Sequence, residues 1–105
     1  MHPSIEQHRA EIAELCRRYA VRRLEIFGSA ARGSDFDPAR SDADFLVEFE
    51  PGSGLPALRQ FFGLADDLEL VLGRPVDLLT RSAVMSSRNY IRRRAILSGA
   101  EPVYG

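Results

Sequence analysis

The spacing of hydrophobic residues changes several times along the chain, and each spacing predicts a different element. Apolar side chains recur at helical spacing from Ile5 to Tyr19, and Ser4 with Gln7 is typical of a capping box that opens a helix. The stretch VRRLEIFGS then alternates between apolar and polar residues, which predicts a short strand ending at Gly28. The stretch ADFLVEF alternates in the same way and predicts a second strand.

The second half of the chain adds three further patterns. An amphipathic stretch from Leu55 to Leu72 predicts a helix that ends at Gly73. Its apolar stripe predicts core positions at Leu58, Phe61, Phe62, Ala65 and Leu68. The stretch PVDLLT predicts a third short strand, and the arginine-rich tail predicts one or two helices. Together these elements predict an α/β or α+β fold, in which helices flank a small mixed three-stranded sheet.

Size and composition fit a single globular domain, residues 1–105. The chain is 45% hydrophobic and 28% charged, as in ordinary globular proteins. Its lone cysteine, Cys16, argues against a disulfide framework and against a thiolate zinc site. No apolar run approaches the roughly 20 residues that a membrane span needs, and the polar N-terminus is unlike a signal peptide. We therefore expect a cytoplasmic protein that has no membrane partner.

All fourteen basic residues are arginine, and the formal net charge is −1. The absence of lysine excludes Schiff-base chemistry and a P-loop lysine, and it leaves arginine to hold phosphates. Because the chain has no global basic field, we expect no direct nucleic-acid partner. The tail arginines are expected on a solvated helix face, with contact to a partner or a nucleotide as the alternative. They are Arg88, Arg92, Arg93 and Arg94.

Two aspartates stand at the entrance of the second predicted strand. Asp42 and Asp44 are two residues apart, so on a strand their carboxylates point to the same side and can converge. Crowded carboxylates are costly without a cation, and Mg²⁺ prefers oxygen ligands, typically one or two protein carboxylates. Asp77 lies in the third predicted strand, where it either joins the pair as a second-metal ligand or acts as a general base.

Gly28 and Ser29 follow the first predicted strand. A glycine at this point lets the backbone approach a ligand closely, and the N–H groups of the next turn can hold phosphate. The hydroxyl of Ser29 adds a donor, and Arg32, one turn on, can reach a phosphate oxygen. Phosphate donors beside carboxylates that bind Mg²⁺ predict a metal-dependent site for a nucleoside triphosphate, with in-line attack at phosphorus.

Other chemistries fail on specific residues. Asp35 and Asp37 form a second Asp-x-Asp, but Pro38 follows them and no strand does, so we expect a loop role. The P-loop motif is absent, and GSAARG lacks the glycine spacing of a dinucleotide fold. The stretch DFDPARSDAD lacks the glycine and the glutamate that an EF-hand needs. A phosphatase with an aspartyl nucleophile would leave the Gly-Ser pair unexplained.

The same motifs resemble one known family. GSAARG at residues 28–33, SDADFLVEF at 41–49 and the lone aspartate of VDLL at 76–79 look like the minimal nucleotidyltransferases of the DNA polymerase β superfamily. The family pattern is Gly-Ser, a gap, Asp-x-Asp and a third acidic residue on the next strand, and all three elements occur here in that order. The resemblance runs from about Val21 to Thr80, and the terminal EPVYG is similar to the family's ending.

The resemblance implies a role for each motif residue. Gly28 and Ser29 would hold the triphosphate. Asp42 and Asp44 would ligate Mg²⁺, while Asp77 would activate the acceptor hydroxyl. The implied reaction transfers a nucleoside monophosphate, with AMP from ATP as the first choice, to a hydroxyl and releases pyrophosphate. Nothing in the motif reads the base, so the motif does not choose among the nucleoside triphosphates.

The resemblance also implies a partner. Larger nucleotidyltransferases append a helical domain that presents the acceptor, and this chain has no room for one. Such small domains are often encoded beside an all-helical protein of the HEPN class, which implies an antitoxin that attaches AMP to a hydroxyl of that protein. One alternative is a non-catalytic module of the same fold that binds a nucleotide or a partner. Another is an antibiotic-modifying enzyme that works as a dimer, and homo-oligomerisation stays open.

Overall fold

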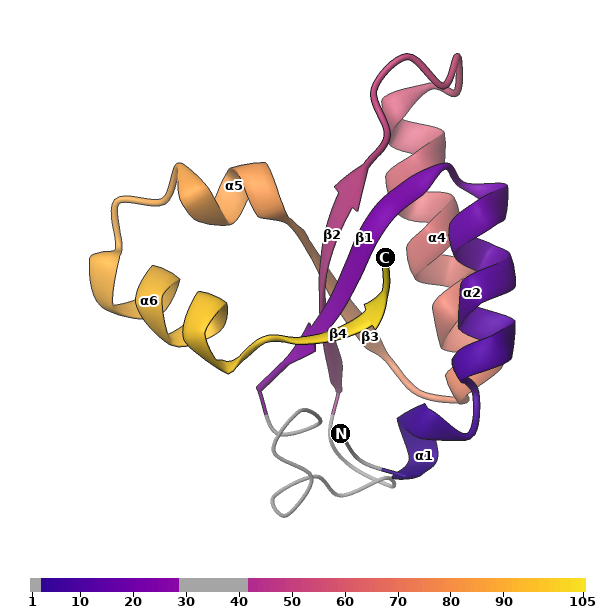
Figure 1. Ribbon diagram of the computed structural model, residues 1–105, viewed down its shortest axis with the longest axis horizontal. Helices are drawn as coiled ribbons and strands as arrows, with labels where there is room; N and C mark the ends of the chain where they lie inside the picture. The colour runs from indigo at the N-terminus through magenta and orange to yellow at the C-terminus, as the bar shows by residue number, and fades with distance from the viewer. Residues whose placement is uncertain (1–2, 29–41) are drawn as a thin grey trace.

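The computed structural model describes residues 3–28 and 42–105. Its helices are α1 (Pro3–Glu6), α2 (Arg9–Arg18), α4 (Ala57–Leu72), α5 (Arg81–Met85) and α6 (Tyr90–Gly99). Its strands are β1 (Val21–Phe27), β2 (Ala43–Phe49), β3 (Val76–Thr80) and β4 (Glu101–Tyr104). The strands form one sheet in the order β3-β2-β1-β4, with helices on both faces (Figure 1). β1 pairs antiparallel with β2 and β4, whereas β2 and β3 are parallel, so the predicted mixed sheet flanked by helices is confirmed.

The sheet has one strand more than the sequence pattern predicts. β4 pairs with β1, at Leu24 with Tyr104 and at Ile26 with Glu101. Its four residues include Pro102, which cannot donate a backbone hydrogen bond and therefore weakens the strand signal. The proline is tolerated because β4 is an edge strand. The prediction of a three-stranded sheet is wrong because it misses this C-terminal strand.

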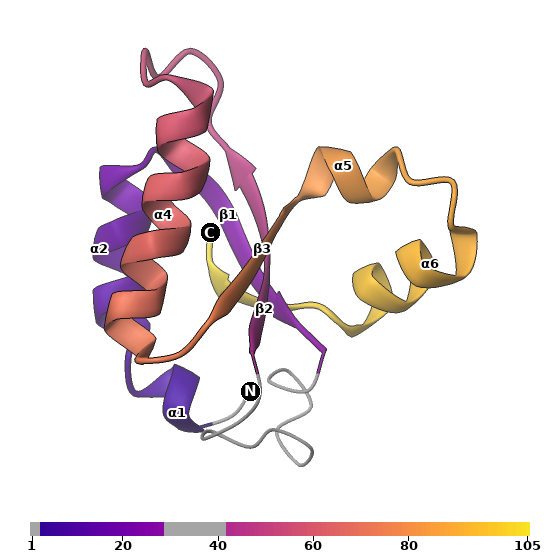
Figure 2. The same cartoon turned by 180° about the vertical axis from the view of Figure 1, so that it is seen from behind.

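The helices α2 and α4 cover one face of the sheet, as Figure 2 shows from behind. The main core lies between them and the sheet, and it takes alternate residues of β2, among them Phe45 and Val47. Both of these side chains are fully buried. The alternation in ADFLVEF is thus explained, because one face of β2 packs into this core while the other carries Asp44.

The predicted helix from Ile5 to Tyr19 is two helices in the structure, α1 and α2. Pro3 begins α1, a position that suits proline because its missing N–H would have no helical partner. Ser4 therefore lies inside the helix, and the predicted capping box is wrong. Ile5 and Ile12 nonetheless reach the main core, both with 0% exposure.

The predicted long helix is α4, and its C-terminal end is confirmed at Gly73. This glycine has a φ of 66° and ends the helix in the left-handed conformation. Pro56 precedes the first residue of α4 and excludes helical backbone at Leu55, so the helix starts later than predicted. The stripe prediction is wrong at Leu58 and Phe62, which are 72% and 57% exposed, because they lie on the flank of α4 that faces away from the sheet.

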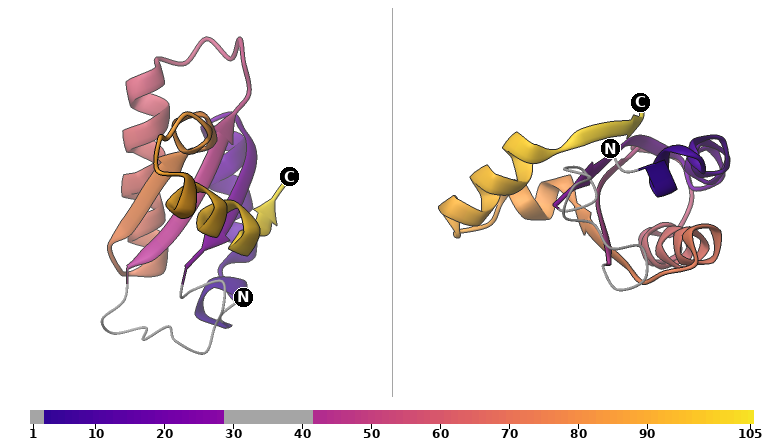
Figure 3. Two further views of the ribbon diagram at one scale, coloured as in Figure 1. Left: turned by 90° about the vertical axis from the view of Figure 1, so that its left-hand side faces the viewer. Right: turned by 90° about the horizontal axis from the view of Figure 1, so that it is seen from below.

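The helices α5 and α6 lie on the opposite face of the sheet from α2 and α4 (Figure 3). A smaller apolar cluster packs there, and its buried members are Phe27, Leu46, Val84 and Ile96. Arg81, at the start of α5, forms an ion pair with the buried carboxylate of Glu25 on β1. Because an unpaired carboxylate is costly to bury, this pair ties α5 to the sheet.

Two further predictions concern a membrane span and the segment at residues 29–41. Within residues 3–28 and 42–105, no helix combines the length and the apolarity needed to cross a membrane. The turn predicted after Gly28 and the loop expected at Asp35 and Asp37 lie within 29–41, outside the described residues. So do Ser29 and Arg32 of the candidate site, and Asp35 and Asp37 of the second Asp-x-Asp.

Candidate active site

Asp44 and Asp77 lie opposite each other on neighbouring strands. β2 and β3 are parallel, and their register pairs these two aspartates. The backbone N–H of Ala43 donates to the carbonyl of Pro75 at 3.0 Å, which fixes the register where the two strands begin. Ala43 and Phe45 belong to the main core, so Asp44 between them points to the α5–α6 face of the sheet. Two of the three predicted acidic residues are thus side by side.

Gly28 follows β1 directly and lies against the carboxylate of Asp44. The residue before it, Phe27, pairs with Asp44 across the antiparallel strands. Gly28 has a φ of +72°, and a Cβ at this position would lie 2.7 Å from Oδ2 of Asp44. A glycine is needed here for both reasons. The turn predicted to hold phosphate therefore begins beside the predicted metal ligand.

The pKa of the Asp44 carboxyl is raised above its usual value. Burial is the main cause, the negative charges of Asp77 and Asp42 add to it, and Arg92 opposes them. Ionised Asp44 therefore costs free energy in the folded protein. A cation bound at this position would remove that cost, which is the behaviour expected of a metal or substrate site.

The oxygen donors at this edge of the sheet fit Mg²⁺ in type. Asp42 is exposed just before β2, Asp44 is half-buried and Asp77 is exposed. Across the described part of the chain, no group of three or more His, Cys, Asp or Glu side chains is gathered closely enough to hold a metal ion. Mg²⁺ usually takes only one or two protein carboxylates and completes its shell with water and phosphate oxygens, and the donors fit that mode. Ligation by all three aspartates stays a prediction.

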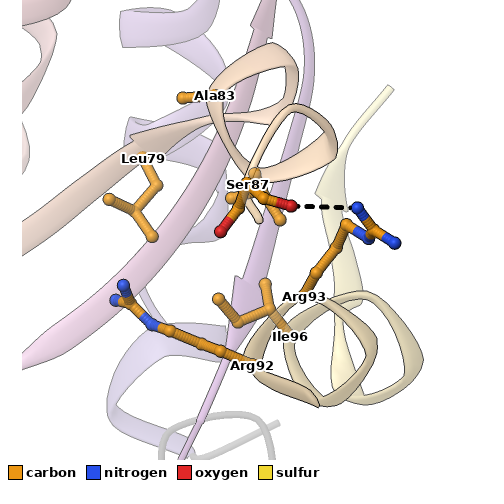
Figure 4. A pocket seen from close by; sticks show the side chains of 7 residues that line it. Leu79, Ala83, Ser87, Arg92, Arg93 and Ile96 are labelled. Carbon is orange, nitrogen blue, oxygen red and sulfur yellow. Dashed lines mark hydrogen bonds between the residues drawn. The ribbon is translucent and has the colours of Figure 1, made fainter. Parts of the chain in front are cut away.

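Arg92 of α6 is a site residue that the sequence left open. It lines one cavity with Phe27 and Gly28, beside the start of the turn predicted to hold phosphate. It also lines a second cavity with Leu79 of β3, and Figure 4 shows its side chain extending from α6 toward that residue. Arg92 thus lies on the face of the sheet that carries Asp44, and its charge acts on that carboxyl.

The two arginines that follow Arg92 on α6 donate hydrogen bonds to other residues of the chain. Arg93 donates to the backbone carbonyl of Ser87 at 2.9 Å. Arg94 donates to the hydroxyl of Tyr90 at 3.3 Å. Among the described residues, the guanidinium of Arg92 makes no comparable hydrogen bond or ion pair, and of these three arginines it is the one that lines the cavity beside Gly28.

The chain is similar to several known proteins. Residues 9–98 match the nucleotidyltransferase domain family. The protein adenylyltransferase MntA of Thermococcus cleftensis is 39% identical over 79 residues, which cover 75% of this chain and 72% of that protein. A solved structure assigned as a minimal nucleotidyltransferase has a TM-score of 0.73 and 31% identity, and the match covers 97% of this chain and 96% of that one.

A more distant solved structure shares the fold. It is the complex of a tri-AMPylated Shewanella oneidensis HEPN toxin with an MNT antitoxin, with a TM-score of 0.61 and 18% identity. The match covers 96% of this chain and 72% of that chain.

Proposed function

The chain belongs to the nucleotidyltransferase domain family, and we propose that it transfers AMP from ATP to a hydroxyl group of a partner protein. It has the minimal nucleotidyltransferase fold that the sequence motifs predict. The partner that we propose is a helical protein of the HEPN class, for which this chain serves as the antitoxin. Two findings support this proposal: a protein adenylyltransferase among its relatives, and a complex of an AMPylated HEPN toxin with an MNT antitoxin among its structural neighbours.

The observation that carries the proposal is the position of Asp44 between Gly28 and Asp77. Gly28 directly follows β1, and Asp77 lies on β3. Both residues therefore adjoin Asp44 at one end of the sheet. An in-line transfer needs the leaving group and the attacking group on opposite sides of the phosphorus. With the triphosphate held at Gly28 and Ser29, the leaving pyrophosphate lies on the β1 side and the acceptor hydroxyl approaches over β3.

Each residue then has one task. Asp77 accepts the proton of the acceptor hydroxyl as its oxygen bonds to the α-phosphorus, and the bond from that phosphorus to the pyrophosphate oxygen breaks. Arg92 donates hydrogen bonds to the phosphate oxygens, where negative charge builds up. Asp42 and Asp44 would hold Mg²⁺, which when bound neutralises charge on the triphosphate. Because these substrates are intracellular, we place the reaction in the cytoplasm.

Label transfer tests the proposal directly. Purified protein, Mg²⁺ and ATP labelled at either the α- or the γ-phosphate are added to a lysate of the source cell. We expect a protein band that is labelled from the α-phosphate alone and is lost with Asp42→Asn. Label from the γ-phosphate alone would make the protein a kinase and overturn the proposal. No label from either position, with MgATP binding intact, would favour the non-catalytic module.

A further inference from the structure

Charge is divided unevenly along the chain. Residues 81–100, here called the α5–α6 arm, carry five arginines and no acidic residue, a formal charge of +5. The other residues carry nine arginines and all fifteen acidic residues, a formal charge of −6. The net charge of −1 hides this division. The arm is a basic element on an otherwise acidic chain, and such asymmetry is typical of an interaction surface.

Most of the charge on the arm is open to a partner. Arg81 is neutralised by its ion pair with Glu25. The other four arginines form no salt bridge with the described residues, and three of them, Arg88, Arg92 and Arg94, are exposed. An acidic ligand would therefore not have to displace an existing ion pair within the described chain.

Exposed apolar side chains stand among these arginines. Met85 is 55% exposed, Tyr90 is 57% exposed and Ile91 is 79% exposed. The guanidinium of Arg93 lies over the Tyr90 ring, 5.7 Å from its centroid, so the ring is held in place. Arginine, tyrosine and methionine are the side chains enriched at protein–protein interfaces. The arm therefore has the composition of a protein-binding surface.

The arm begins where the strand of Asp77 ends. β3 runs directly into α5, and the hydroxyl of Thr80 accepts a hydrogen bond from the N–H of Ala83 at 3.2 Å. A cavity of about 150 Å³ lies between β3, α5 and α6. Its apolar lining includes Leu79, which is two residues after Asp77 and lies on the same face of the sheet (Figure 4). The cavity is thus next to the predicted base.

We propose that the α5–α6 arm is the docking surface for the acceptor protein, which presents acidic and apolar residues around its hydroxyl-bearing side chain. This inference rests on the proposed function, in which the acceptor approaches over β3. β3 is the edge strand on the far side of the sheet from β4, and the arm extends from its end. The acidic residues of the acceptor pair with Arg88 and Arg94, its apolar residues cover Ile91, and the hydroxyl-bearing side chain enters the cavity beside Asp77.

A protein fits this surface better than a nucleic acid does. Stacking on rings is the main sequence-independent contact to single strands. Of the exposed apolar side chains on the arm, Tyr90 has the one ring, and Arg93 lies over it, whereas Met85 and Ile91 have none. The carboxylate of Asp44, on which the charge of Arg92 acts, has Asp42 and Asp77 near it, and these negative charges repel a phosphate backbone. An acidic peptide segment can avoid them, because its charges are separate side chains that meet the arginines one at a time.

The test measures how tightly the full chain binds fluorescent random copolymers. Binding is monitored by fluorescence anisotropy at physiological salt. One copolymer contains Glu and Tyr, the other Lys and Tyr, and we expect binding of the first alone. The double variant R88E/R94E should weaken that binding at least about tenfold, because like charges then face the probe. The matched control R22E/R59E reverses two exposed arginines on β1 and α4 and should change it less than about twofold.

The apolar part of the surface has its own pair of variants. Ile91→Gln should weaken binding of the Glu/Tyr copolymer at least about threefold and leave binding of polyglutamate unchanged, because an apolar contact is lost and no charge. Leu58→Gln is the control, since Leu58 is similarly exposed, at 72%, on α4. Leu58→Gln should change neither the binding of the Glu/Tyr copolymer nor the binding of polyglutamate. Thermal unfolding of each variant checks that the fold is kept.

Three results would overturn the proposal: equal losses in the arm and control variants, preference for the Lys/Tyr copolymer, or tighter binding of a single-stranded RNA oligonucleotide through Arg88 and Arg94. Labelling of the Glu/Tyr copolymer from α-labelled ATP is a separate readout. Binding through the arm without label would mean that the docking surface stands and AMP transfer fails. Label that R88E/R94E leaves unchanged would mean that AMP transfer stands and the docking surface fails.

Discussion

Gly28 and Asp44 are in contact where β1 ends and β2 begins. A Cβ on residue 28 would lie 2.7 Å from Oδ2 of Asp44, and the φ of +72° at Gly28 is itself unfavourable for other residues. Gly28 of the Gly-Ser motif and Asp44 of the Asp-x-Asp motif are far apart in the sequence, but they lie against each other in the fold. Gly28, which begins the turn predicted to hold phosphate, and Asp44, a predicted metal ligand, therefore constrain each other's position.

Gly28→Ala should lower both stability and AMP transfer. The left-handed backbone costs an alanine roughly 1–2 kcal/mol, and the added methyl group must also displace the carboxylate of Asp44. We expect a lower melting temperature and at least about a tenfold loss of transfer, because the ligand is moved from its position. Thermal unfolding and transfer from α-labelled ATP measure the two effects.

The matched control for this variant is Gly73→Ala. Gly73 has a similar φ of +66°, but a Cβ there would meet nothing within 4 Å. Gly73→Ala should lose only the stability that the left-handed backbone costs an alanine, and it should keep its transfer activity. Equal activity losses in the two variants would show that the contact between Gly28 and Asp44 has no part in the reaction.

Asp44→Asn should stabilise the metal-free protein at neutral pH. Burial raises the pKa of folded Asp44 above the usual 3.8, so the ionised carboxylate opposes folding at pH values above that raised pKa. Below 3.8 the carboxyl is protonated in the folded and unfolded states, and the opposition is absent. The gain should be under about 1 kcal/mol, because solvent screens this half-buried group. Thermal unfolding should show this gain in stability near neutral pH, and the gain should be absent in acid.

The control for this measurement is Asp66→Asn, which changes an exposed aspartate on α4. It should leave the melting temperature nearly unchanged at both pH values. A gain for Asp44→Asn that persists in acid would contradict the explanation from charge.

Asp77→Asn should keep MgATP binding and lose most of the transfer. The side chain is exposed, so its replacement leaves the fold intact, but the acceptor hydroxyl loses the group that takes its proton. General bases typically contribute 10²–10⁴-fold, so we expect a loss of about 10²-fold or more in kcat. Nucleotide titration and single-turnover transfer separate the two effects. Unchanged turnover would remove Asp77 from the role of base.

The central strands follow from local sequence patterns. ADFLVEF alternates because β2 packs one face into the main core, and this alternation alone places Asp44 on the other face. Gly73 ends α4 as predicted, because a left-handed residue is the usual end of a helix. The pairing of Asp44 with Asp77 also follows once β2 and β3 are taken as neighbours. These features are local or depend on a single strand pairing.

The remaining features depend on contacts between distant segments. β4 exists because its residues pair with β1, and the four residues EPVY have no strand pattern of their own. Leu58 and Phe62 have the spacing of core residues, but they lie on the flank of α4 that is exposed. The three consecutive arginines of α6 are equivalent in the sequence. Only the position of α6 beside Gly28 and Leu79 distinguishes Arg92 from the other two.

Arg92→Gln should lower transfer by about 10²-fold, the usual cost of removing one donor to developing charge. Arg92 is exposed, so the melting temperature should change little. Its MgATP affinity and the slow hydrolysis in which water replaces the acceptor should fall as well, because the proposed contact of the guanidinium is with the phosphates. Arg92→Lys should restore only part of the activity, since an ammonium cannot make two parallel hydrogen bonds.

Arg94→Gln separates the phosphate contact from the charge of the arm as a whole. Arg94 is two residues away and bonds to Tyr90, so its loss should leave MgATP affinity and hydrolysis by water unchanged. It should weaken only transfer to an acidic protein acceptor. If both variants lower hydrolysis equally, the effect is one of general positive charge, and Arg92 has no specific contact with the nucleotide. If Arg92→Gln alone lowers it, the orientation of α6 over the sheet is what selects this arginine for the site.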